Sequence, residues 1–208
     1  RGGWPAPTPL ALAAALCVLA GAPAAQATGF VWNTGDFVPG ATAPSPLLAG
    51  DTLTIGAGPG KRFNGVAFAN QGTVLWTTDA IGGGSSATIA NAGLWDIQAD
   101  SPTFQWGFGG QPVFTNTGTL SKSAGALTSL GNYHFVNDAG GLISVGSGVL
   151  SFNGGNPEFN DGSRFSGAGS AQIDAAATFS GGLKSDNLVL ANGSFNGVSA
   201  NFNGGVAG

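Results

Sequence analysis

The chain has 208 residues, of which only 8% are charged, 42% are hydrophobic and 38 are glycine, a composition that excludes disorder driven by charge. Its net charge of −4, with six lysines and arginines, lacks the cationic footprint of a nucleic-acid-binding protein, so we expect no nucleic acid partner. One histidine, one cysteine and no methionine leave little material for a metal site or a histidine-dependent catalytic centre, so we expect no metal and no cofactor.

Residues 1–27 have the pattern of a secretory signal peptide. The apolar run of residues 10–24 follows Arg1 and precedes the sequence Ala-Gln-Ala at 25–27, a small-x-small cleavage motif. A short transmembrane anchor is the alternative, because the uncharged stretch approaches the length that spans a bilayer. Cleavage would remove Cys17, so disulfides cannot stabilise the mature chain. We therefore expect a secreted protein.

Residues 28–49 show no hydrophobic period and are expected to form a short, irregular N-terminal cap. From Gly50 onward, short apolar alternations are interrupted by glycine, asparagine, aspartate and serine, which is typical of strands joined by tight turns. Strands are expected at residues 51–55, 118–122, 141–145, 148–152 and 187–191. Their alternation directs Leu53 and Ile55, and Leu142 with one of its neighbours, toward an interior.

An internal repeat determines the predicted fold. An apolar-x-Asn pattern followed by glycine occurs four times, at spacings of 21, 25 and 21 residues, with Asn70, Asn91, Asn116 and Asn137. Further on, Phe159 and Phe179 are 20 residues apart and Phe202 follows after 23. A repeat of this length cannot bury its apolar side alone, so neighbouring repeats must stack. Residues 50–208 are long enough for about seven coils of a parallel β-solenoid.

Two explanations remain open for the repeated asparagines. If they stack in register, their amides form a ladder of hydrogen bonds along the solenoid. Alternatively they are ordinary turn residues without mutual contact, because asparagine tolerates the left-handed backbone of a tight corner. Both explanations keep the solenoid.

The segments FTNTGTLSKSAGAL (114–127) and FVNDAGGLISVGSGVLSFNGG (135–155) resemble the repeats of bacterial exported surface proteins, namely autotransporter passenger domains and haemagglutinin-like adhesins. The likeness covers residues 50–208 and implies an all-β fold, a right-handed parallel β-helix. It also implies a longer protein associated with the outer membrane, whose chain continues beyond Gly208 into a β-barrel or a sorting tail. We therefore expect residues 50–208 to be truncated at the C-terminus.

The resemblance favours a non-enzymatic stalk or adhesin that attaches the cell to a surface or matrix. Its expected partners are a host or matrix carbohydrate or a surface protein, and its open ends would permit stacking or self-association. The alternative is a carbohydrate-active β-helix enzyme, a polysaccharide lyase or hydrolase with its catalytic part beyond Gly208.

The enzyme alternative needs paired carboxylates, or a base beside a cation. The densest polar cluster is Glu158, Asp161 and Arg164, but in one strand the two carboxylates would face opposite sides, so we expect a solvated turn with a surface ion pair. Asp96 and Asp100 are a weaker pair. No catalytic residue is therefore expected.

Two kinds of ring carry the remaining candidates. His134 should point outward if Phe135 points inward, which favours an exposed histidine over a general base. The side chains of Trp76, Trp95 and Trp106 either fill the interior or, if they point outward, stack on sugar rings.

Overall fold

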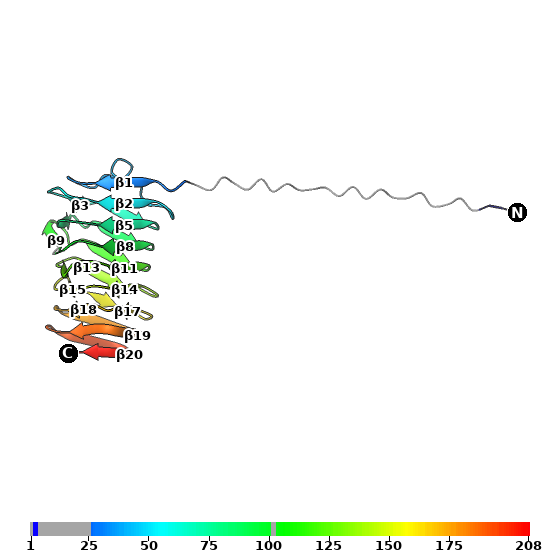
Figure 1. Cartoon of the computed structure of the whole chain (residues 1–208). Coiled ribbons are helices and arrows are strands. Elements are labelled where there is room, and N and C mark those ends of the chain that lie inside the picture. Colours follow the sequence, from blue (N-terminus) through cyan, green and yellow to red (C-terminus); the bar gives the residue numbers. More distant parts are fainter. Residues whose placement is uncertain (1, 4–25, 101–102) are drawn as a thin grey trace.

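The computed structural model describes residues 2–3, 26–100 and 103–208. The predicted signal peptide and its membrane-anchor alternative lie almost entirely outside these residues. In the described part of the chain every regular element is a β-strand, and twenty parallel strands coil into about eight turns (Figure 1). The predicted all-β solenoid is therefore confirmed.

Each full turn places one strand in each of three parallel stacks, which form the walls of the solenoid. The first stack contains β1 (Gly29–Trp32), β2 (Thr52–Ile55), β5 (Thr73–Trp76), β8 (Leu94–Ile97), β11 (Thr119–Lys122), β14 (Leu142–Val145) and β17 (Arg164–Ser166). The second contains β3 (Arg62–Asn64), β6 (Ile81–Gly84), β9 (Thr103–Phe108), β12 (Leu127–Leu130), β15 (Val149–Phe152) and β18 (Ser170–Ile173). The third contains β4 (Ala67–Asn70), β7 (Thr88–Asn91), β10 (Val113–Asn116), β13 (His134–Asn137) and β16 (Glu158–Phe159).

The last two turns are built from long strands. β19 (Ala177–Leu190) bends around the solenoid and pairs with β16, β17 and β18 in succession. β20 (Phe195–Ala207) follows it in parallel. The three walls therefore continue to the end of the chain.

The segment 28–49, predicted as an irregular cap, supplies one turn more than the seven expected. Its strand β1 pairs in register with β2, and isolated bridges join Asp36 to Arg62 and Leu47 to Asn70. Its prolines explain why no period is visible in the sequence, because a proline has no N–H to donate to a strand ladder. Only four of its residues form a regular strand.

Alternate side chains in each strand point into the solenoid. Leu53 and Ile55 are fully buried, as predicted. The prediction for Leu142 was wrong, because Ile143 and Val145 of β14 are buried and Leu142 points outward. Three apolar residues within Leu142–Val145 leave the phase of the strand ambiguous in the sequence, and stacking of Ile143 on Leu120 decides it.

The repeated asparagines form a ladder, which we call the asparagine ladder. Each side-chain Nδ2 donates to the Oδ1 of the next asparagine at 2.7 Å, through Asn70, Asn91, Asn116 and Asn137. The first three amides also donate to backbone oxygens of the next turn, at 3.0–3.2 Å. All four side chains are completely buried. The structure thus confirms the ladder and excludes independent turn residues.

Both ends of the asparagine ladder are closed by backbone groups. The Oδ1 atom of Asn70 accepts the N–H of Gly72 at 3.0 Å, and the Nδ2 atom of Asn137 donates to the carbonyl oxygen of Gly141 at 2.9 Å. An unpaired amide in an apolar interior would cost about 1–3 kcal/mol. The described turns avoid that cost along the whole ladder.

Phenylalanines continue the asparagine position after the ladder ends. Phe159 lies in register with Asn137, and Phe179 with Phe159, their rings stacked with centroids 5.1 Å apart. The expected continuation to Phe202 was wrong, because that residue pairs with Leu183 in another wall. The irregular pairing of β19 with β20 shifts the register there.

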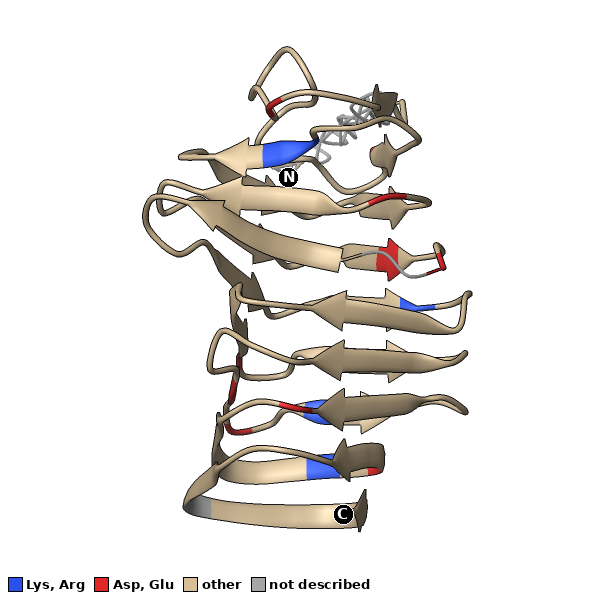
Figure 2. Cartoon of the chain, turned by 90° about the vertical axis from the view of Figure 1, so that its left-hand side faces the viewer, with Lys and Arg blue, Asp and Glu red and all other residues tan. Residues whose placement is uncertain are grey.

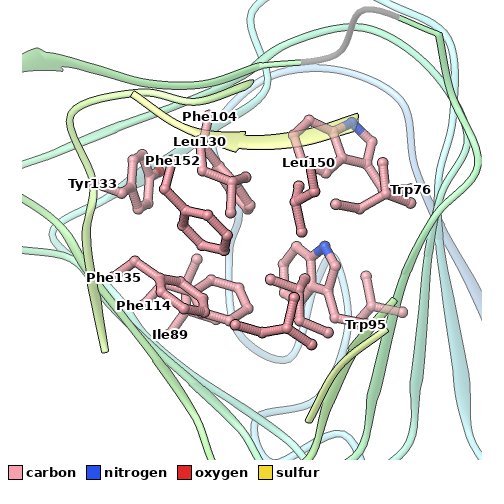
Figure 3. Packing of buried hydrophobic residues seen from close by; sticks show 14 of the residues in the cluster. Trp76, Ile89, Trp95, Phe104, Phe114, Leu130, Tyr133, Phe135, Leu150 and Phe152 are labelled. Carbon is pink, nitrogen blue, oxygen red and sulfur yellow. The ribbon is translucent and has the colours of Figure 1, made fainter. Parts of the chain in front are cut away.

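Aromatic rings fill much of the interior (Figure 3). Phe114 stacks on Phe135 with centroids 5.6 Å apart, and the ring of Phe152 lies 4.8 Å from that of Phe135. Trp95 meets Phe114 edge-on at 5.1 Å. Each ring contacts rings of adjacent turns, so burial couples the turns to one another.

We expect large stability losses when these rings are truncated. Alanine at Phe114, Phe135, Phe152 or Phe179 should each lower the free energy of unfolding by about 3–5 kcal/mol, since a cavity then opens between turns. The control Leu127→Ala removes an outward side chain that is 45% exposed and should cost within about 0.5 kcal/mol. Denaturant unfolding followed by circular dichroism measures both, and equal losses would contradict the stacked core.

The asparagine ladder gives a second prediction. Asn116→Asp replaces a donor to Asn137 and Leu142 by a carboxylate, and should lower the free energy of unfolding by about 3 kcal/mol or more. Asn153→Asp makes the same chemical change at an exposed position and should cost within about 0.5 kcal/mol. Thermal melts of the two variants test the contrast, and a tolerated Asn116→Asp would argue against the ladder.

Candidate functional site

One turn departs from the regular stacking, and its surface is the strongest candidate site. Strand β9 pairs with β6 above it along residues 104–108, with a bulge opposite Gly83 and Gly84. Below it, β12 reaches only Thr103 and Phe104. Residues 105–108 therefore have no strand pairing on their lower edge, and β9 lies at the side of the stack in Figure 1.

The departure explains the 25-residue spacing within the repeat. Compared with the preceding turn, two extra residues lie between the register positions of Ile97 and Phe104, one forms the bulge of β9, and one lies in the corner before Val113. The four extra residues are absorbed outside the asparagine ladder, which keeps its register. An irregular spacing is thus the sequence signal for this site, and the sequence analysis did not use it.

Tyr133 fills the interior where β9 leaves the wall. Its hydroxyl donates to the carbonyl oxygen of Gly82 at 2.9 Å, from two turns away. A Cβ atom at Gly83 would collide with this hydroxyl, so the run of three glycines at 82–84 makes room for the ring. Burial raises the pKa of Tyr133 above its usual range, and the phenol stays neutral.

Trp106 is the exposed aromatic side chain of this turn. Its indole is 42% exposed, whereas Trp76 and Trp95 are fully buried. The Trp106 Nε1–H donates to the carbonyl oxygens of Phe108 and Gly109 at 3.2 and 3.1 Å, which fixes the ring against the bulge. Of the two alternatives for the tryptophans, the interior thus holds Trp76 and Trp95, while Trp106 faces solvent.

Two surface hollows flank β9, and Gln105 borders both. The upper hollow, of about 270 Å³, is lined by Gly60, Lys61, Arg62, Ala80, Gly82, Gln105, Gly107 and Phe108. The lower hollow, of about 210 Å³, is lined by Thr103, Phe104, Gln105, Ser129, Gly131, Asn132 and Asn153. Amides, hydroxyls and backbone groups therefore surround the exposed strand.

The cations of the upper hollow are already engaged within the protein. Arg62 Nε lies 2.8 Å from Asp36 Oδ1, and its guanidinium lies 5.8 Å from the centre of the Phe108 ring. Hydrogen bonds from Asn64 and Arg62 hold the pKa of Asp36 below its usual value. Lys61 is buried and donates to the carbonyl oxygens of the loop at 56–58. The hollow is therefore suited to a neutral polar ligand.

The candidates for catalysis are held in separate contacts. Glu158 Oε1 lies 3.5 Å from His134 Nε2 of the preceding turn, so Glu158 forms its ion pair with His134 and not within its own turn, where we expected one. Asp161 Oδ1 accepts the backbone N–H of Gly182 at 2.6 Å. Arg164 lies on β17, in register with Leu142 and Lys184.

His134 points outward, as expected from the burial of Phe135. Its Nδ1 lies 3.1 Å from the carbonyl oxygen of Gly155, and the side chain is 27% exposed. The ring thereby contacts two groups of the following turn, Gly155 and Glu158. This arrangement ties neighbouring turns together.

Asp96 and Asp100 also connect neighbouring turns. Asp96 accepts hydrogen bonds from Gln98 at 2.8 Å and from Ser123 at 2.9 Å. Asp100 accepts the backbone N–H of Ala126 at 2.6 Å. Within the described ranges no group of three or more His, Cys, Asp or Glu side chains could hold a metal ion.

Comparisons of the chain with models of protein families, with curated proteins and with solved structures found no match. Among the residues that the structure describes, no helix is long and apolar enough to cross a membrane.

The contacts of the acidic turn predict unequal effects of two substitutions. Asp161→Ala should lower the free energy of unfolding by about 1 kcal/mol or more, because the Gly182 N–H loses its acceptor, and Asp161→Asn should restore most of the loss. Glu158→Ala should cost within about 0.5 kcal/mol, since its pair with His134 is largely exposed. Chemical denaturation measures all three, and equal costs for Asp161→Ala and Glu158→Ala would contradict the assignment.

Proposed function

We propose that this chain is a non-enzymatic, exported bacterial surface protein, a β-solenoid stalk or adhesin passenger of the autotransporter or haemagglutinin-like type. In this role the solenoid is a rigid support and the β9 turn is its attachment surface. The observation that carries the proposal is the exposure of Trp106 on the one described turn where the wall of the solenoid opens. A carbohydrate of the host or matrix is the proposed ligand.

The chemistry of the β9 turn supports a neutral carbohydrate. Sugar rings present apolar C–H faces to an aromatic ring and hydroxyls to planar amides. Trp106 offers a fixed aromatic face, and Gln105, Asn132 and Asn153 offer amides that both donate and accept. The engaged cations of the upper hollow leave little attraction for an anion at this position.

The engagement of the acidic side chains supports attachment over catalysis. Glycoside hydrolysis needs two carboxyl groups on opposite sides of one bond. Glu158 is paired with His134, and Asp161 supports a backbone N–H of the next turn. Both groups therefore have structural partners in adjacent turns.

Binding of neutral oligosaccharides tests the proposal. The protein should retard on a panel of immobilised neutral glycans, and Trp106→Ala should weaken retention about tenfold or more through loss of the aromatic contact. Leu127→Ala, which removes another exposed apolar side chain, should leave retention unchanged.

Two results would overturn the proposal. Retention that is unaffected by Trp106→Ala would remove β9 as the attachment surface. Release of reducing ends from a bound polysaccharide would instead support the carbohydrate-active enzyme.

A further inference from the structure

Two cations of the last turns lack partners within the protein. Lys61 and Arg62 have ion pairs with Asp79 and Asp36, and Lys122 is fully buried with its Nζ on the carbonyl oxygen of Ala124. Arg164 and Lys184 are exposed, and no carboxylate oxygen of the described residues lies within 4 Å of either. Figure 2 shows the corresponding blue segments on two successive turns near the C-terminal end.

The fold forces these two like charges together. Arg164 and Lys184 occupy the same register position in adjacent parallel strands, on the outer side of the first stack. Adjacent strands are about 4.8 Å apart, and like charges in facing positions destabilise a sheet. A bound anion would remove that repulsion, because it can lie close to both cations at once.

A hollow with further polar groups adjoins the two cations. It measures about 380 Å³ and is lined by Gly162, Ser163, Arg164, Gly182, Leu183, Lys184, Asn201 and Asn203. Asn203 lies in register with Lys184, so an amide continues the column of cations into the last turn. Asn201 lies in register with Gly182, which has no side chain to cover the floor.

We propose that Arg164 and Lys184 bind the carboxylate or sulfate group of an acidic polysaccharide. The cations would contact the anionic oxygens, and the amides of Asn201 and Asn203 would contact neighbouring hydroxyls. This mixture of charged and neutral donors along two turns fits a sugar acid within a chain better than a compact inorganic anion. The exposed carboxylate of Asp186, two residues after Lys184, limits the favourable field to one side of the hollow.

This inference goes beyond the proposed function, because the site is on another wall and takes a charged ligand. It does not require binding at β9. Each site has its own variant, so failure of one is distinguishable from failure of the other.

Affinity electrophoresis and calorimetry with three probes test the site: polygalacturonate, neutral dextran and inorganic sulfate. The unmodified protein should bind polygalacturonate, with affinity falling as NaCl rises from about 20 to about 300 mM. The double variant Arg164→Gln/Lys184→Gln should weaken this binding about tenfold or more. Asp186→Asn should strengthen it, and Trp106→Ala should leave it unchanged.

A charge-matched control separates the site from net charge. Gln26→Glu/Thr88→Glu also adds two negative charges, at exposed positions outside the hollow, and should retain polygalacturonate binding. Circular dichroism melts verify that both double variants are folded. Equal losses in the two double variants would overturn the proposal, as would inorganic sulfate binding as tightly as the polymer or dextran binding equally well.

Discussion

The structure depends on a buried amide that only its neighbour in the next turn can satisfy. Each asparagine of the ladder has a side chain with two donor hydrogens and an acceptor oxygen in an otherwise apolar interior, and a shift of one residue would leave them unpaired. Hydrophobic burial favours stacking in any register, whereas the amide favours one. The ladder therefore fixes the order that the aromatic rings then stabilise.

A fixed interior makes variation outside it affordable. The turn with four extra residues keeps Asn91 and Asn116 in contact at 2.7 Å, and the surplus backbone emerges as the bulge of β9. Tyr133 closes the interior behind that bulge, so Trp106 can face solvent without opening the core. The surface with the most distinctive chemistry thus arises where the wall, and not the ladder, is irregular.

The repeat in the sequence was sufficient to predict the solenoid, because the spacing of Asn70, Asn91, Asn116 and Asn137 reports directly on the length of one turn. The first turn was missed because its prolines disrupt the strand pattern, and Leu142 was misplaced because its neighbours are also apolar. The adjacency of Arg164 and Lys184 could not be read locally, since they are 20 residues apart and meet only through the register of β17 and β19. Likewise, three tryptophans with similar surroundings in the sequence differ in exposure because only Trp106 lies where the wall opens.

The nearest-neighbour character of the ladder has a consequence for how such a rod can change in length. Each asparagine interacts with the turns directly above and below it, and the segments Asn70-Gln71-Gly72 and Asn91-Ala92-Gly93 occupy equivalent positions. Loss or duplication of a whole turn would join equivalent ends and leave every amide with a partner. Loss of half a turn would bring different walls together. The solenoid therefore has a reading frame of its own, and its evolution by tandem duplication is restricted to complete turns.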